Sequence, residues 1–227
     1  MTDYRCEATT VAGFVQQLSV AYVTHGYWWY VTGDVPERKD PAAVDRTLVE
    51  KYAIHLSRWT RYRRKSLGLA NVHYLRYGRF FVLVATMGKH RFYEVEGPRV
   101  LDIRRVPIKF HGHSIGFRQC RGGGSWHSSV RIEEGEYRNL KAYFCAVARR
   151  RSAEELAAEL GRLRFEPYAP IRSQLLSVLR AVNRERFAGG LEPVPASALR
   201  FRRSPVLPFA WPDPSPCLVC VGECRCG

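Results

Sequence analysis

The spacing of apolar residues changes near Gly135, and this change constrains the fold more than any other feature of the chain. Between residues 71 and 132, aromatic and β-branched residues form short runs separated by glycines, a pattern typical of β-strands. Beyond Gly135 the apolar residues recur every three or four positions, which is typical of helices. Because helical patterns also precede the strands, we predict an α+β protein with a largely antiparallel sheet.

Turn and capping residues divide these regions into elements. We predict strands over residues 25–37, 71–78, 79–88, 91–97, 99–119 and 126–132, and helices over 10–24, after Asp40-Pro41, and over 57–68, 136–151, 152–163 and 170–188. Residues 1–134 are thus expected to form a basic α+β region, and residues 135–203 a helical region packed on it. Residues 204–227 are rich in proline and cysteine and are expected to be an extended tail.

The positive charge of the chain is concentrated in two windows. The net charge is +15, from 36 Lys and Arg against 21 Asp and Glu. Residues 51–93 contain ten basic residues and no acid, and residues 103–132 contain six more, again without an acid. These two windows therefore carry all of the excess charge. A local excess of arginine predicts a polyanionic partner, most often nucleic acid.

The segment 57–68 is the most basic part of the first window and is predicted to be a helix. Arg58, Arg61 and Lys65 would share one face of it, and Trp59 and Tyr62 would lie on another. The preceding helix, the break near residues 55–57 and the following hairpin loosely resemble a winged helix-turn-helix. We predict phosphate contacts from this helix, the hairpin and the second window: Arg58, Arg61, Arg63, Arg64, Lys65, Arg76, Arg79, Arg104, Arg105, Arg118 and Arg121.

Aromatic residues are dense in the predicted strands around Trp28-Trp29 and Phe80-Phe81. Sheets that bind single-stranded nucleic acid expose aromatic rings on which bases stack. Adjacent strand residues point to opposite faces, so at least one of Trp28 and Trp29 is expected to pack against a helix. We therefore expect one face of the sheet to be core and leave the other as a candidate for base stacking.

The segment FHGHSIGF, residues 110–117, places His111 and His113 two positions apart in a predicted strand. This pair resembles the histidine signature of the HUH endonucleases, with Gly112 in place of the large apolar residue of that family. The resemblance implies a divalent metal held by the two histidines, with His127 as a third ligand, and a helical tyrosine nucleophile, Tyr137 or Tyr143. The alternative is that both histidines belong to a solvated, polyanion-facing strand, and that the tyrosines are packing residues.

Four cysteines lie close together near the C-terminus, in CLVCVGECRCG. Cys217, Cys220, Cys224 and Cys226 could supply four thiolates to a zinc ion. The gap between the two pairs is much shorter than in usual zinc ribbons, so zinc is the minority interpretation.

Three hypotheses follow for function. The leading one is a nucleic-acid-binding protein that needs no cofactor, with DNA and RNA, single-stranded or duplex, all left open as partners. The second is a metal-dependent, HUH-like enzyme that cleaves or transfers single-stranded DNA. The third is a basic scaffold that binds an acidic protein partner. The chain carries no secretory signal at its N-terminus and no apolar run as long as a membrane span, so an intracellular location, in cytoplasm or nucleoid, is expected.

Overall fold

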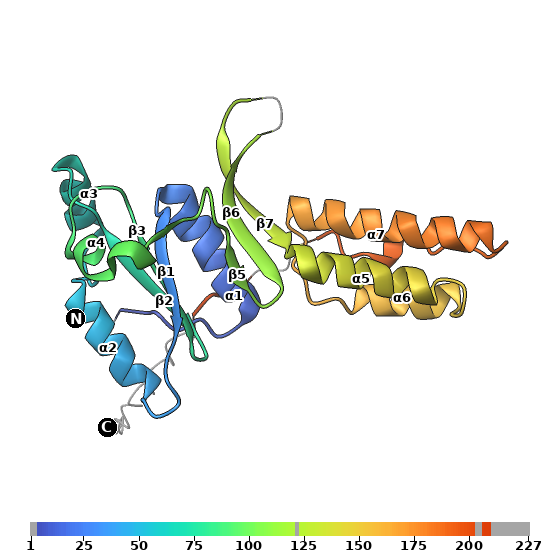
Figure 1. Ribbon diagram of the computed structural model, residues 1–227, viewed down its shortest axis with the longest axis horizontal. Helices are drawn as coiled ribbons and strands as arrows, with labels where there is room; N and C mark the ends of the chain where they lie inside the picture. The colour runs from blue at the N-terminus through green and yellow to red at the C-terminus, as the bar shows by residue number, and fades with distance from the viewer. Residues whose placement is uncertain (1–3, 121–122, 203–205, 210–227) are drawn as a thin grey trace, which may run out of the picture.

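The predicted α+β class is confirmed by a computed structural model, which describes residues 4–120, 123–202 and 206–209. The strands form two antiparallel sheets instead of one (Figure 1). A group of helices surrounds the first sheet, and a second group extends away from the end of the second sheet (Figure 1). No helix in the described ranges is both long enough and apolar enough to cross a membrane.

The first sheet has the strand order β2-β3-β1-β4 and is buried on both faces. Its strands are β1 (Trp29–Asp34), β2 (Val72–Tyr77), β3 (Phe80–Ala85) and β4 (Leu101–Asp102). The predicted hairpin is confirmed: β2 and β3 pair from Val72–Ala85 to Tyr77–Phe80, and Gly78 has the positive φ that the tight turn requires. β1 lies against the other edge of β3, so this hairpin is part of the central sheet and not a separate wing.

One face of this sheet packs against the N-terminal helical segment. α1 (Val11–Gln16), η1 (Gln17–Tyr22) and η2 (Val23–His25) follow one another without a break, capped by Thr10 and ended by Gly26 in a left-handed conformation. The predicted helix over residues 10–24 is thereby confirmed. Phe14 contacts Phe80 of the first sheet and Phe110 of the second, so this segment fills the space between the two sheets (Figure 1).

The other face of the sheet is covered by α2 (Pro41–Lys51), the segment after it, and α4 (Arg91–Glu96). Asp40 caps α2 by accepting hydrogen bonds from the amides of Ala42 and Ala43, as expected. The predicted strand over residues 91–97 is wrong, because these residues form α4 and the short helix η3 (Gly97–Arg99). His90 caps α4, and the buried Tyr52 hydroxyl donates to Glu96, so tertiary contacts override a weak strand pattern.

The second sheet has the order β5-β6-β7, with β5 (Ile108–Phe110), β6 (His113–Gln119) and β7 (Trp126–Ile132). The β pattern predicted over residues 99–119, with Pro107 marking an edge or bulge, is divided among β4, β5 and β6. It is interrupted by a turn over residues 103–107 and by the turn at His111-Gly112, where both residues have positive φ. β5 pairs only with residues 113–115 of β6, so the rest of that edge of β6 lies beside the 103–107 turn.

The C-terminal helices are α5 (Glu134–Val147), α6 (Ala153–Gly161) and α7 (Ala169–Ala188), followed by η4 (Ala196–Ala198). The predicted capping box of Ser152 and Glu155 begins α6. Gln174 of α7 exchanges two hydrogen bonds with the backbone of Ile132, which fixes these helices to the end of β7. A single apolar cluster runs from α1 through the second sheet into α7, so the helical region shares its core with the part before it.

His73 on β2 is enclosed by tyrosine rings and is expected to make stability depend on pH. Its ring lies 4.4 Å from that of Tyr22 and 4.8 Å from that of Tyr27. Burial, with the nearby charge of Arg61, lowers the pKa of His73 to about 3. In the unfolded chain the pKa of a histidine is about 6.5, so between these pH values only the unfolded state binds the proton.

The contribution of His73 to the free energy of unfolding should therefore be fully present above pH 6.5. Below that pH, the free energy of unfolding should fall by about 1.4 kcal/mol for each pH unit. Urea denaturation should show a loss of about 2 kcal/mol between pH 7.5 and pH 5. Burial also lowers the pKa of His113, which adds in the same direction. A His73→Phe variant should lose most of this slope; an unchanged slope in that variant would contradict the assignment to His73.

Candidate nucleic-acid interface

α3 (Arg58–Ser66) is a helix in which every residue is exposed or half-buried. Ser57 caps it by accepting a hydrogen bond from the amide of Thr60, and Gly68 ends it with a positive φ, as expected. Isolated helices of this length are marginal in water, so α3 depends on its attachments to the rest of the protein. Those attachments are almost entirely polar.

α3 is attached to residues 70–71, which precede β2, and to residue 88, which follows β3. Asn71 donates to the carbonyl of Arg61, and the Arg64 guanidinium donates to the carbonyl of Ala70. The backbone at Gly88 approaches so closely that a Cβ there would lie 2.6 Å from the amide nitrogen of Ala70. Arg61 and Arg64 are the half-buried basic residues of α3, and the backbone carbonyl of Arg61 and the guanidinium of Arg64 hold the helix in place. Arg58, Arg63 and Lys65 are exposed.

The exposed side of α3 combines cations with aromatic rings. Trp59 and Tyr62 expose 82% and 72% of their surface. None of the salt bridges in the described ranges involves a residue of α3. Basic residues three and four apart on a helix repel one another when no acid lies between them. The exposed face of α3 therefore carries positive charge that no acid of the described residues neutralises in a salt bridge.

A second basic surface lies where the 103–107 turn meets the β6–β7 hairpin. Two adjoining hollows there, of about 540 and 710 Å³, share Arg104, Arg105, Phe117 and Trp126. We call these two hollows together the hairpin groove. It is lined by residues of the β6–β7 hairpin, which projects from the body of the protein (Figure 1). Its further lining residues are Trp28, Asp102, Ile103, Pro107, Gly116, Arg118, Gln119, His127 and Arg131.

Three aromatic rings form a stack along the hairpin groove. Phe117 lies 5.1 Å from Trp28 and 5.9 Å from Trp126, and the Phe117 and Trp126 planes are only 18° apart. Phe117 is buried, whereas 49% of Trp126 is exposed. Trp126 thus forms the outer end of the stack, and the two rings behind it hold its indole in place.

Arg104 joins the groove to the first sheet. Its guanidinium lies 4.7 Å from the Trp28 ring and 5.3 Å from the Trp29 ring, and it donates to both carboxylate oxygens of Asp102. Burial alone would raise the pKa of Asp102, but the hydrogen bonds from Arg104 outweigh it and lower that pKa. Arg104 is therefore held by protein groups, and Arg105 and Arg118 are the exposed predicted contacts in the groove.

Trp29 connects this surface with the region of α3. It lines a further hollow of about 530 Å³ with Gly68, which ends α3, and with Met87 and Lys89. Trp28 and Trp29 pack against different apolar clusters, as the strand alternation predicts. Both faces of the first sheet are covered, so the stacking face that we considered for that sheet is not available. Among the described residues of the two basic windows, the exposed tryptophan and tyrosine rings are instead those of Trp59 and Tyr62 on α3 and of Trp126 on the second sheet.

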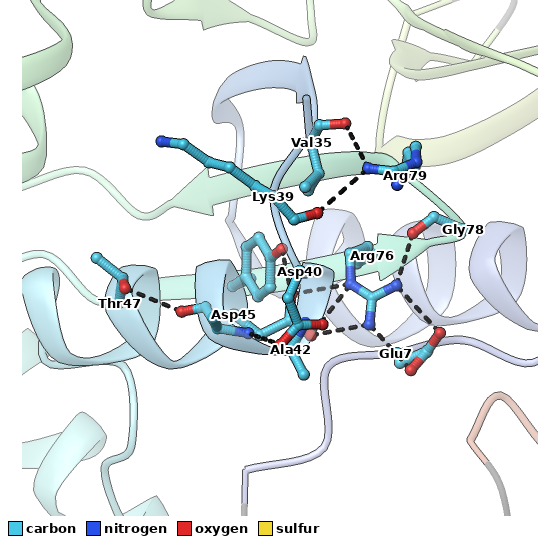
Figure 2. A network of polar contacts seen from close by, with 12 residues as sticks. Glu7, Val35, Lys39, Asp40, Ala42, Asp45, Thr47, Arg76, Gly78 and Arg79 are labelled. Carbon is cyan, nitrogen blue, oxygen red and sulfur yellow. Dashed lines mark hydrogen bonds and ion pairs between the residues drawn. The ribbon is translucent and has the colours of Figure 1, made fainter. Parts of the chain in front are cut away.

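Arg76 does not belong to the predicted interface, because it is buried with only 4% of its surface exposed. Figure 2 shows its guanidinium held by Asp45, Glu7 and the carbonyl of Gly78. All three of its nitrogens are engaged, each by two acceptor oxygens. Its role is structural: it joins β2 to α2 and to the N-terminal segment.

Arg79 is exposed, but its guanidinium is also used by the protein. It donates to the carbonyl of Val35 and more weakly to that of Lys39 (Figure 2). It also donates to the carbonyls of Pro36 and Glu37. Arg79 therefore orders the loop between β1 and α2. Of the predicted contact residues, Arg58, Arg63, Lys65, Arg105 and Arg118 face the solvent, Arg61 and Arg64 are half-buried, and Arg76, Arg79 and Arg104 are held by protein groups.

The two histidines of FHGHSIGF do not share a strand face, so that expectation is wrong. His111 lies in the β5–β6 turn with φ +43° and is exposed, whereas His113 begins β6 and is buried against Phe165. His127 pairs with Arg118 of β6. Arg118 lies five residues beyond His113 on this strand, so His113 and His127 are about 16 Å apart along the sheet. No group of three or more metal-ligating side chains occurs in the described parts of the chain.

The two candidate tyrosines lie on α5 in different settings. Tyr137 is half-buried against the main apolar cluster, and the exposed Tyr143 donates its hydroxyl to Glu159 at 2.7 Å. That hydrogen bond raises the pKa of Tyr143, because it favours the protonated phenol. The nuclease alternative thus stays a prediction. Arg121 and the four cysteines Cys217, Cys220, Cys224 and Cys226 lie outside the described residues.

Trp126 and Phe117 line the candidate interface and were not among the residues predicted from the sequence. Both lie in the second acid-free window, and a tryptophan beside a glycine-rich loop in a basic window was the available signal. Phe117 contacts Trp28, which lies almost a hundred residues earlier in the chain, and no local sequence pattern predicts such a contact. Comparison with protein-family models gives no match, and no curated protein is significantly similar to the chain.

Proposed function

We propose that this protein binds nucleic acid through the exposed side of α3 and through the hairpin groove. The observation that carries the proposal is α3 itself. It places three exposed cations beside two highly exposed aromatic rings, with no acid of the described chain paired to them. Cations that attract phosphates and rings that contact bases or sugars are the combination that nucleic-acid surfaces require.

The distribution of ion pairs elsewhere in the molecule supports this proposal. In the C-terminal helices, Arg138, Arg149 and Arg151 each pair with a glutamate. The acids of the protein therefore neutralise part of the positive charge there, whereas α3 has no acidic neighbour in a salt bridge. Charge that serves only solubility does not need such segregation, and segregated charge attracts a polyanion over a long range.

Salt dependence of binding tests this proposal. Fluorescence anisotropy should be measured with a labelled 16-nucleotide strand, as DNA and as RNA, and with the corresponding duplexes, between 50 and 300 mM NaCl. With three to five phosphate contacts, the logarithm of the association constant should fall with the logarithm of salt with a slope of about −2 to −4. Polyglutamate serves as the competitor that distinguishes an acidic protein partner.

Two results would overturn the proposal. One is the absence of binding to all four nucleic acids at low salt. The other is displacement by polyglutamate at the same charge concentration as by unlabelled nucleic acid, because a surface that recognises only negative charge makes no use of its aromatic rings. The second result would favour a basic scaffold that binds an acidic protein.

A further inference from the structure

We infer that the hairpin groove binds unpaired bases, with Trp126 as the ring on which a base stacks, so that the protein prefers single strands to duplex. This inference rests on the proposed function and names the form of nucleic acid that the groove takes. It follows from the position of Trp126 beside Phe117, from the cations that line the groove, and from the place of the groove between the 103–107 turn and the β6–β7 hairpin.

The stack makes Trp126 a rigid platform. Phe117 covers one side of the indole with nearly parallel planes, and Trp28 supports Phe117 from behind. In the described parts of the chain, Phe117 is the one aromatic ring paired with Trp126, and half of the Trp126 surface is exposed. A base that continues this stack meets a ring whose orientation is already set, so little side-chain entropy is lost on binding.

Cations line the hairpin groove beside this platform. Arg105 comes from the 103–107 turn and Arg118 from β6, and both are exposed in the groove. Gln119 is the cross-strand neighbour of Trp126 and brings an amide that can form hydrogen bonds with a base or a sugar. A strand whose base lies on Trp126 therefore has partners for its neighbouring phosphates on the turn and on the hairpin.

The need for an unpaired base follows from stacking geometry. In a duplex, both faces of each internal base are covered by the neighbouring base pairs, so an indole cannot lie against them without unstacking. A single strand exposes base faces at little cost, and stacking on an aromatic ring tolerates every base. The groove is therefore expected to prefer single strands without a strong sequence preference.

The test compares Trp126→Ala and Trp126→Phe with a matched control, Phe187→Ala. Phe187 is an aromatic residue of α7 with 86% of its surface exposed, and it lies outside the groove. Anisotropy with the labelled 16-nucleotide strand and its duplex should show that Trp126→Ala weakens single-strand binding on the order of tenfold to a hundredfold. Duplex binding should change less than twofold, Trp126→Phe should keep most of the single-strand affinity, and Phe187→Ala should bind like the unchanged protein.

Tryptophan fluorescence provides a second measurement that does not depend on the alanine variant folding. Binding of the unlabelled single strand should quench the fluorescence of the unchanged protein, and the quenched fraction should fall in Trp126→Phe. Equal effects of Trp126→Ala on strand and duplex, or an unchanged quench in Trp126→Phe, would overturn the stacking inference. In either case salt-dependent binding would survive and the proposed function would stand, whereas the absence of any binding by the unchanged protein would overturn both.

Discussion

Replacing Arg58, Arg63 and Lys65 together by alanine is expected to weaken nucleic-acid binding by about a hundredfold at 100 mM salt. Each of these side chains is exposed on α3 and forms no salt bridge with an acid of the described residues, so each is available to a phosphate. Loss of three phosphate contacts should reduce the salt slope by about 2 on a single strand and about 2.7 on a duplex. Alanine is a strong helix former, so α3 should remain helical in this variant.

The matched control removes the same charge from the C-terminal helical region. Arg150, Arg162 and Arg180 are exposed, and their replacement by alanine lowers the net charge equally. This control should keep almost the full affinity and the full slope. If both triple variants lose affinity to the same extent, the partner responds to the total charge of the protein, and α3 is not the contact surface.

Replacing Arg76 by methionine is expected to lower the free energy of unfolding by about 3 to 5 kcal/mol. The change leaves the carboxylate of Asp45 buried without the guanidinium that now contacts both of its oxygens. The hydroxyl of Tyr74 still donates to Asp45 at 2.6 Å, but one neutral donor does not replace a bidentate cation. Urea denaturation at pH 7, followed by circular dichroism, measures the loss.

Arg91→Met is the matched control, because Arg91 is exposed and forms no salt bridge with another described residue. Its effect should remain within about 0.5 kcal/mol. A loss below about 1 kcal/mol for Arg76→Met would show that Asp45 is easily rehydrated and that the network of Figure 2 is weak. If Arg76→Met stays folded and binds nucleic acid with an unchanged salt slope, its exclusion from the interface is supported as well.

Much of the fold could be predicted because its signals are local. The Asp40 and Ser57 caps, the glycine turn at Gly78 and the capping box of Ser152 all fall where the structure has helix starts and a hairpin turn. These residues act through hydrogen bonds and φ angles within a few positions of the chain. The sequence therefore specified them without knowledge of any distant contact.

The errors come from segments whose local preference is weak. Residues 91–97 alternate well enough to predict a strand, but Tyr52 and Glu96 meet across two helices and stabilise α4. Residues 99–119 contain two turns that split a continuous β pattern, and the second turn separates His111 from His113. A two-residue motif loses its meaning when the strand that would align its side chains ends between them.

The sequence predicted where the positive charge of the candidate site lies, but not which residues belong to that site. Composition alone located the cations in two acid-free windows, because acids absent from a segment cannot neutralise it locally. Burial then divided residues of one type into different roles: Arg63 faces the solvent, Arg76 forms a buried network, and Arg104 lies between two tryptophans.

The sequence by itself determined where several helices begin, where the β2–β3 hairpin turns, that the protein is α+β, and that its positive charge is concentrated before residue 133. The tertiary structure alone decided which arginines keep free donors and which aromatic rings meet. The reason is that charge and backbone preference belong to single residues or short segments. The availability of a side chain depends instead on neighbours that are distant in sequence, as Trp28 and Trp126 are on either side of Phe117.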